Sequence, residues 1–276
     1  MKPSVSVVAL RKGAKAAAGT RATSLRRQLL TRHTLLRACS FVILLGVWQL
    51  LVFLPGARRI PGPVTTLQAV FSLAPGIYLQ QAAKSLLRVL AGFLIAAAVG
   101  IPLGIAIGYW RIVRELTFPV VEFLRPVPPI AWIPLSVLFF TSVESQIVFL
   151  TFYGAFFPIV YNTAGGVVGV DRTFVRAARS LGASEWQVFR RIMLPGALPS
   201  VFTGLTIAMG VTWLMVVAAE MVASRGGLGY LTWEAYTTLN YPQIFVGMGA
   251  IGILGSLSSV MIRLVGRTIM RWRRRF

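Results

Sequence analysis

Residues 175–182 read Val175-Arg176-Ala177-Ala178-Arg179-Ser180-Leu181-Gly182, and residues 192–195 read Ile192-Met193-Leu194-Pro195. The segment that contains both is polar and basic, and it separates two long apolar stretches. Such an island between apolar runs is typical of a loop that joins two membrane helices and protrudes from the bilayer.

The island carries signals for two short helices. Asp171 is a suitable N-cap for a helix that runs through Arg179, and Gly182 can adopt the left-handed turn that ends it. Ser184 can cap a second helix, Glu185–Met193, which we expect Leu194-Pro195 to stop because proline lacks the backbone N–H. The sequence therefore predicts an angled helical pair that could fit a groove on another protein; a basic amphipathic connector on lipid headgroups is the alternative.

Composition places the rest of the chain in a membrane. Of its 276 residues, 56% are hydrophobic and 13% are charged, whereas about a quarter are charged in soluble domains. Several mostly apolar runs are long enough to cross a hydrocarbon core of about 30 Å. A β-barrel would instead show short alternating segments. We predict an all-α, polytopic membrane helical bundle.

The net charge of +21 is unevenly distributed. Most Lys and Arg lie in four patches: residues 1–37, Arg111 with Arg114, Arg172 to Arg191, and Arg263 to Arg275. Basic residues beside apolar runs mark the cytoplasmic side and suit an anionic lipid surface. We expect no nucleic-acid partner, because no recognition motif accompanies the charge.

Charge and length together predict six transmembrane helices, with the N and C termini in the cytoplasm. The expected spans are 39–54, 80–109, 116–140, 146–168, 198–222 and 243–265. We expect a short outer helix over 64–73, a basic cytoplasmic tail over 1–37, and a transmembrane domain over 38–276 with a cytoplasmic loop over 171–195. All four basic patches then face the same side.

Catalysis by this chain is not expected. His33 is the only histidine, and Cys39 is the only cysteine, so a Ser-His-Asp triad and a two-histidine metal site are excluded. The sequence lacks the G-x-x-x-x-G-K-[ST] phosphate-binding loop. We expect no metal and no cofactor, and a partner would have to bind any ATP.

Two features inside the predicted spans bear on packing and on a pathway. Gly100, Gly104 and Gly108 recur at four-residue spacing, which lets two membrane helices approach closely. The segment 125–134 holds four prolines, and a broken helix at membrane depth is tolerated where it lines a water-filled cavity. Arg125 begins this segment about 14 Å inside its span. We expect it to be the only basic residue that deep, and such a charge marks a pathway or pairs with Glu122 one turn away.

Three motifs resemble those of one transporter family. The spacing Ala177-Ala178-x3-Gly182-x9-Ile192-x-Leu194-Pro195 resembles the signature of binding-protein-dependent ABC permeases, although Arg176 replaces the usual acid. Residues 125–135, Arg-Pro-Val-Pro-Pro-Ile-Ala-Trp-Ile-Pro-Leu, resemble the third-span motif of the nitrate, sulfonate and taurine branch. Ala218-Ala219-Glu220-Met221, followed by Gly226-Gly227-Leu228-Gly229-Tyr230, resembles the end of its fifth span.

The resemblance implies a permease subunit of a type I ABC importer in a bacterial inner membrane, moving a small anion such as taurine, an alkanesulfonate or nitrate. It implies a second permease copy, two cytoplasmic ATPase subunits and an extracytoplasmic solute-binding protein. The candidate solute-pathway residues are Arg125, Glu122, Trp132 and Glu220, of which Glu220 is more suited to a cap or gate contact. The candidate ATPase-coupling residues are Arg176, Ala177, Ala178, Arg179, Gly182, Ala183, Leu194 and Pro195. The alternative is a secondary transporter or channel that works alone.

Overall fold

In a computed structural model of the chain, the structure describes residues 35, 36, 38–54, 60–72, 75–223, 226–270 and 272. The described residues form helices, and no strand occurs among them. The chain divides into two units, Met1–Thr65 and Thr66–Phe276. The predicted tail over 1–37 lies almost entirely outside the described residues, and the domain boundary at 37/38 stays a prediction.

The described part of the first unit is dominated by an apolar helix, Ala38–Leu51, which covers most of the first predicted span. The helix α2, Pro63–Ser72, begins in this unit. Its bounds confirm the short helix predicted over 64–73. Thr65 donates its hydroxyl to the Gly62 carbonyl at 2.8 Å, just ahead of the first turn.

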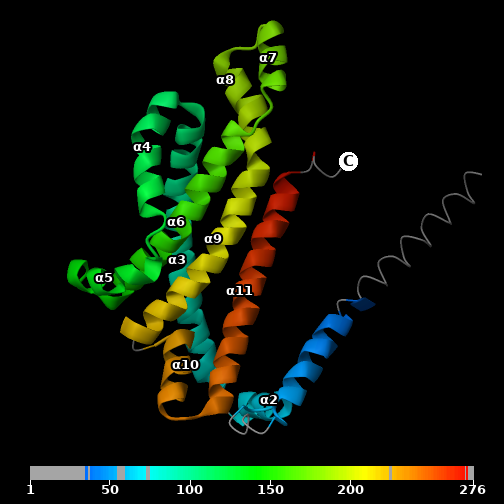
Figure 1. Cartoon of the computed structure of the whole chain (residues 1–276), viewed down its shortest axis with the longest axis vertical. Helices are drawn as coiled ribbons and strands as arrows, with labels where there is room; N and C mark the ends of the chain where they lie inside the picture. Colours follow the sequence, from blue (N-terminus) through cyan, green and yellow to red (C-terminus); the bar gives the residue numbers. More distant parts are fainter. Residues whose placement is uncertain are drawn as a thin grey trace, which may run out of the picture. The chain divides into compact units, whose positions relative to one another are not determined.

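The second unit is built around long helices (Figure 1). In chain order its elements are α3 (Pro75–Tyr109), α4 (Arg111–Leu124), the 3-10 turn η1 (Pro129–Trp132), α5 (Ile133–Phe139), α6 (Val143–Val168), α7 (Arg172–Ser180), α8 (Glu185–Val188), the π-helical turn η2 (Phe189–Met193), α9 (Leu194–Ala223), α10 (Leu228–Thr237) and α11 (Tyr241–Ile269). The short helices α7 and α8 project from one end of this unit, and α10 lies at the opposite end.

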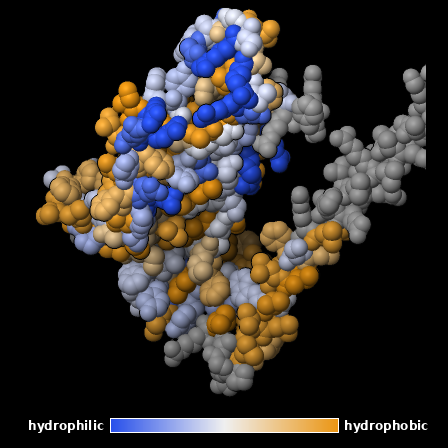
Figure 2. Space-filling model, turned by 45° about the horizontal axis from the view of Figure 1, so that its top comes forward, coloured by the Kyte–Doolittle hydropathy of each residue, from blue (hydrophilic) through white to orange (hydrophobic). Residues whose placement is uncertain are grey.

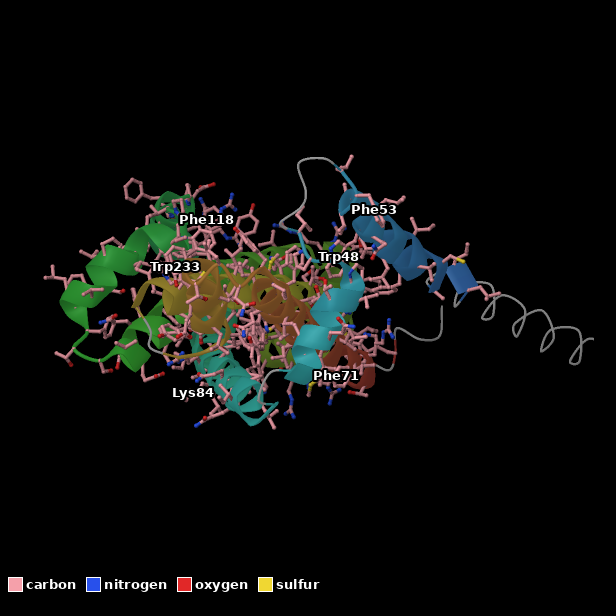
Figure 3. The ribbon with its side chains drawn as sticks, turned by 90° about the horizontal axis from the view of Figure 1, so that it is seen from below. Trp48, Phe53, Phe71, Lys84, Phe118 and Trp233 are labelled. Atoms are coloured by element: carbon pink, nitrogen blue, oxygen red, sulfur yellow. The ribbon has the colours of Figure 1, made fainter. Side chains whose placement is uncertain are left out.

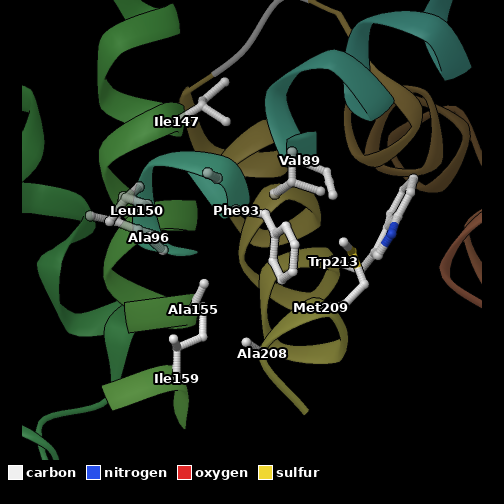
Figure 4. Close-up of a cluster of buried hydrophobic side chains, with 13 residues drawn as sticks. Val89, Phe93, Ala96, Ile147, Leu150, Ala155, Ile159, Ala208, Met209 and Trp213 are labelled. Atoms are coloured by element: carbon white, nitrogen blue, oxygen red, sulfur yellow. The ribbon is translucent and has the colours of Figure 1, made fainter. Parts of the chain in front are cut away.

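The core lies between α3, α6 and α9. Figure 4 shows side chains of this core, among them Val89 and Phe93 of α3, Leu150 of α6 and Ala208 of α9, which belong to one buried cluster. The central helix α6 is apolar on every side and is the most buried of the long helices, as expected for a helix with neighbours on several faces. In contrast, few residues of α11 are fully buried within the chain.

The glycine stripe of α3 faces α6, as predicted. A Cβ atom on Gly104 would lie 2.6 Å from the Cβ of Thr163, and one on Gly108 would lie 2.5 Å from the Cβ of Val167. Both distances are well inside van der Waals contact, so only glycine permits this approach of the two helices. In α11, Gly249 and Gly252 have open space around them, whereas a Cβ on Gly255 would be in ordinary contact with Trp213 at 3.5 Å.

The third predicted span is broken. Its two parts, Arg111–Leu124 and Pro129–Phe139, are bent by 85°. Three of the four prolines, Pro126, Pro128 and Pro129, lie at the break, and each removes a backbone donor. Pro134 lies in the first turn of α5, where a proline is tolerated. The expectation of interrupted backbone in this segment is confirmed.

Within the described residues, four helices are long and apolar enough to cross a membrane: Gly76–Tyr109, Val143–Val168, Glu185–Ala223 and Tyr241–Ile269. The bent pair makes a fifth if it counts as one span, and Ala38–Leu51 is a shorter apolar helix. Each of the six predicted spans coincides with one of these elements. The count of six and the side on which each terminus lies stay predictions.

One boundary prediction is wrong. Leu194-Pro195 does not stop the second loop helix, because Glu185–Ala223 runs on as a single helical stretch of 39 residues. The π-helical turn η2 precedes the proline. Its wider i→i+5 spacing changes the bonding pattern at the point where the ring of Pro195 would clash with an α-helical carbonyl.

Candidate functional site

The loop between α6 and α9 forms a rigid knob, which we define as residues 171–193. The Asp171 carboxylate accepts from the backbone N–H of Thr173 at 2.8 Å, so Asp171 is the predicted N-cap of α7. This backbone hydrogen bond, together with the one from the Thr173 side chain, lowers the pKa of Asp171 below its ordinary value. Ser184 and Gln187 form a capping box at the start of α8, which confirms the second predicted cap.

Gly182 joins the two knob helices with a φ of +78°, the predicted left-handed turn. The Gly182 N–H bonds to the Arg179 carbonyl, and the Ala183 N–H bonds to the Ala178 carbonyl, each at 3.0 Å. This pair of bonds is a Schellman motif, which fixes the end of α7. Arg179 also forms an exposed ion pair with Glu185 at 2.9 Å, which adds a side-chain contact between the two helices.

The knob presents a mixed surface. Arg176, Ala177 and Arg179 are exposed, and Ala178 and Ala183 are half-buried. Three large apolar side chains, Phe174, Leu181 and Trp186, are 64%, 88% and 65% exposed. Apolar side chains at this exposure among charges are typical of a protein interface. Sequence reasoning missed these three, although they stand out as isolated apolar residues in a basic segment. Leu194 and Pro195 lie at the start of α9, beyond the knob.

Arg125 lies on a cleft of about 300 Å³ between the broken span, α6 and α9. Its guanidinium is 4.7 Å from the centre of the Tyr161 ring, a cation–π distance. Tyr153 and Asn162 also line the cleft. Tyr153 donates its hydroxyl to the carbonyl of Leu124 at 3.2 Å. The cleft therefore combines a cation, a phenol and an amide.

The other three predicted pathway residues lie elsewhere. Trp132 packs on Tyr153 with ring centres 5.0 Å apart, so it supports the cleft from behind. Glu122 is exposed and outside the cleft lining, and among the described residues neither Glu122 nor Arg125 belongs to an ion pair. Glu220 is completely buried at the far end of α9.

Glu220 is the centre of a buried polar network that joins α3, α6, α9 and the start of α10. The Ser85 hydroxyl and the Arg88 guanidinium donate to its carboxylate at 2.8 Å, and the Gly229 N–H donates at 2.9 Å. The Arg88 guanidinium also binds Glu144 of α6 through two nitrogens, at 2.8 and 2.5 Å. All donors that face Glu220 are therefore satisfied by one carboxylate.

The network also fixes the loop before α10. Arg88 donates to the Gly226 carbonyl at 2.7 Å, and the Leu228 N–H donates to Ser85 at 2.9 Å. Gly227 has a φ of +114°, and a Cβ there would collide with the Glu220 carboxylate. The glycine is therefore required twice, for its backbone conformation and for the space. The expected cap role of Glu220 agrees with this geometry.

Sequence reasoning missed Arg88 and Glu144. Arg88 lies twelve residues into the candidate span Gly76–Tyr109, about 18 Å along the helix axis, and it is 7% exposed. The expectation that Arg125 is the only deep basic residue is therefore wrong. Lys84, one turn earlier, is exposed and projects outward from α3 in the end-on view of Figure 3. A lone arginine in an apolar run was the available signal.

The family described as binding-protein-dependent transport system inner membrane component matches residues 100–275. The chain belongs to this family. It is therefore a multi-pass permease of the inner membrane, and the matched region includes the Arg125 cleft, the knob and Glu220.

Individual relatives agree with this assignment. A probable ABC transporter permease of Brucella abortus is 39% identical, covering 87% of this chain and 96% of its own. A nitrate import permease of Leptolyngbya laminosa is 34% identical over 87% of this chain and 88% of its own. The taurine transport system permease of Escherichia coli is 35% identical over 88% and 91%. These relatives confirm the resemblance to ABC permeases of the nitrate, sulfonate and taurine branch.

A solved structure supports the fold. The permease resembles a chain from the inward-facing MetNI methionine ABC transporter, with a TM-score of 0.54 and 18% sequence identity over 71% of this chain and 95% of that one. At this identity the likeness concerns the fold alone, and it confirms the predicted all-α permease bundle of the type I importer kind.

Proposed function

We propose that this permease forms the transmembrane pathway of an ATP-driven importer for a small anion, such as taurine, an alkanesulfonate or nitrate. The observation that carries the proposal is the cleft in which Arg125 lies over Tyr161. The names of the nitrate and taurine relatives agree with the sign of this charge.

Arg125 is suited to bind an oxyanion that passes the cleft. Its guanidinium forms no ion pair with another described residue, so its donors are not committed to a carboxylate. A planar guanidinium can donate two parallel hydrogen bonds to sulfonate or nitrate oxygens. The Tyr161 ring holds the guanidinium without neutralising it, which leaves a positive potential for the anion. This arrangement favours the pathway role of Arg125 over pairing with Glu122.

The knob is suited to receive force from a separate ATPase. Its two helices are fixed by caps, by the Schellman turn and by the Arg179–Glu185 ion pair. A rigid body with exposed apolar side chains can fit a groove on a partner and move with it. We assign the coupling contacts to the loop residues proposed from the sequence, Arg176 to Arg179, Gly182 and Ala183, and add Phe174, Leu181 and Trp186.

The complete importer in this proposal has two permease copies, two cytoplasmic ATPases and an extracytoplasmic binding protein. The knob, the Arg111–Arg114 patch and the end of α11 then face the cytoplasm, as the positive-inside rule requires. In Figure 2 the most hydrophilic side chains gather over the end of the body that carries α7 and α8, whereas apolar side chains cover the flanks.

The test is uptake by the reconstituted complex, with taurine and nitrate offered separately. Arg125→Gln should lower uptake of the anion at least about tenfold, because an anion that leaves water without a partner costs several kcal/mol. Arg125→Lys should retain part of the uptake, since it keeps the charge and loses the planar fork. Arg263→Gln on α11 removes one charge outside the cleft and serves as the control.

Two outcomes would reject the anion role. One is that the Arg125→Gln variant transports the anion as well as the wild type. The other is that the double variant Arg125→Gln/Glu122→Gln regains full transport. Either result would leave Arg125 with a structural task only.

A further inference from the structure

A second, larger cleft lies at the base of the knob, far from Arg125 along the bundle. Its volume is about 780 Å³, within the range of about 300–1,000 Å³ usual for ligand sites. It is enclosed by the end of α3, the start of α4, the end of α6, α7 and η2. Five arginines line it: Arg111, Arg114, Arg172, Arg176 and Arg179.

Few acidic side chains neutralise the charges of these arginines. The one acid in the described lining is Glu185, which already pairs with Arg179 at 2.9 Å. Arg111 pairs with Glu115, and both are well exposed. Neither Arg172 nor Arg176 forms an ion pair with a residue in the described ranges. Like charges held around one cleft repel each other, so an anion bound between them would lower the energy.

Arg114 gives the cleft a fixed wall. Its guanidinium donates to the carbonyls of Ile107 and Gly108 at 3.0 and 2.7 Å, at the end of α3. These bonds hold the side chain against the helix terminus and leave its charge unneutralised by a carboxylate. The cation is therefore pre-positioned, which reduces the entropy lost when a ligand binds.

The other wall of the cleft is apolar, and it consists of residues at the ends of two candidate membrane spans, which places the cleft near the membrane surface. Gly108 and Tyr109 end the candidate span Gly76–Tyr109, and Val167 and Val168 end the candidate span Val143–Val168. The cleft thus begins where two membrane helices leave the hydrocarbon and where the arginines start. This is the level of lipid headgroups, and basic pockets between helix ends at this level bind anionic lipids.

We propose that this cleft binds the phosphate headgroup of an anionic phospholipid from the adjacent leaflet. Arg111 and Arg172 contact the phosphate from α4 and α7, and the apolar wall receives the glycerol and the first part of an acyl chain. The apolar wall is the reason to prefer a lipid over a free anion, which would gain nothing from it. The site is separate from the solute cleft and adds a lipid requirement to the knob region.

The test measures lipid retention by native mass spectrometry of the full permease, released from nanodiscs that contain phosphatidylcholine and phosphatidylglycerol. The variant Arg111→Gln/Arg172→Gln should weaken retention of phosphatidylglycerol at least about tenfold. Each basic residue near the membrane surface contributes substantially to the affinity for an anionic lipid, and the variant removes two of them. The control Arg190→Gln/Arg191→Gln removes the same number of charges, from η2 in the knob and outside the cleft lining, and should retain the lipid like the wild type.

Three results would overturn the proposal. Equal losses in both variants would show general attraction to the anionic surface. Displacement of the lipid by inorganic phosphate at equal concentration would assign the site to a free anion. Loss of the lipid whenever the ATPase is bound would make the cleft part of the protein interface. Retention that depends on Arg111 and Arg172, with and without the ATPase, would support the lipid site.

Discussion

Replacing Glu220 by glutamine tests the buried network most directly. The wild-type carboxylate receives hydrogen bonds from Ser85, Arg88 and the Gly229 N–H. A glutamine keeps one acceptor oxygen and replaces the other with an NH2 group. At least one of the three groups that donate to Glu220 in the wild type then loses its acceptor and faces the N–H groups of the glutamine. Arg88 then stays buried with half of its counter-charge removed.

The magnitude follows from the burial of both partners. Glu220 is 0% exposed and Arg88 is 7% exposed. Two unit charges about 4 Å apart attract by about 4 kcal/mol at an effective dielectric constant of about 20, and breaking a buried pair by removing one partner costs about 3–5 kcal/mol. Arg88 keeps its two bonds to the exposed Glu144, so we expect the lower end, about 3 kcal/mol.

The assay is unfolding of the purified permease by SDS added to a mild micelle, followed by tryptophan fluorescence. The matched control is Glu115→Gln, whose ion pair with Arg111 has a similar distance of 2.7 Å but is well exposed. That change should cost about 0.5 kcal/mol or less. A loss below about 1 kcal/mol for Glu220→Gln, or strict additivity with Arg88→Gln, would refute the reasoning, since coupled partners must be non-additive.

Three further predictions concern the helix packing and the knob. Gly104→Ala should destabilise the same unfolding transition by about 1–3 kcal/mol through overpacking, whereas Gly165→Ala, with open space around it, should stabilise it by about 0.5–1 kcal/mol. Gly182→Val should strain the left-handed turn and weaken co-purification of the ATPase. Gly182→Asn should preserve co-purification, because asparagine tolerates this conformation. Equal ATPase binding by the two variants would reject the role of the turn. Asp171→Ala should speed amide hydrogen exchange at Thr173, and Asp171→Asn should speed it less, because asparagine keeps an acceptor oxygen but loses the charge. Because the pKa of Asp171 is lowered, the wild-type protection should be full above the carboxyl's ordinary pKa and should fall toward that of Asp171→Asn as the pH drops through the lowered pKa.

The sequence predicted those features whose causes are local. The caps at Asp171 and Ser184 and the turn at Gly182 each depend on residues a few positions apart, so propensity alone identifies them. The glycine stripe of α3 was equally readable, because helical spacing fixes its face. The break after Leu124 followed from the prolines.

The buried network could not be predicted in the same way. Arg88 and Glu220 lie 132 residues apart, and no local pattern pairs them. The sequence offered Arg88 as a charge within an apolar run, but the identity of its partners required the packing of α3, α6 and α9. The prediction that Pro195 ends the second loop helix was wrong for the opposite reason. The local signal of the proline was strong, but the helix continues past it after the π-helical turn.

This uninterrupted helix has a mechanical consequence. The stretch Glu185–Ala223 is about 58 Å long at 1.5 Å per residue. One end carries half of the knob, and the other end carries Glu220, which accepts a hydrogen bond from the Gly229 N–H in the first turn of α10. We infer that a displacement of the knob along this axis would be carried by one helical stretch to the opposite end of α9. The backbone hydrogen bonding of this stretch is altered at the π-helical turn and at Pro199 inside α9, so we expect any bending to occur at these two points.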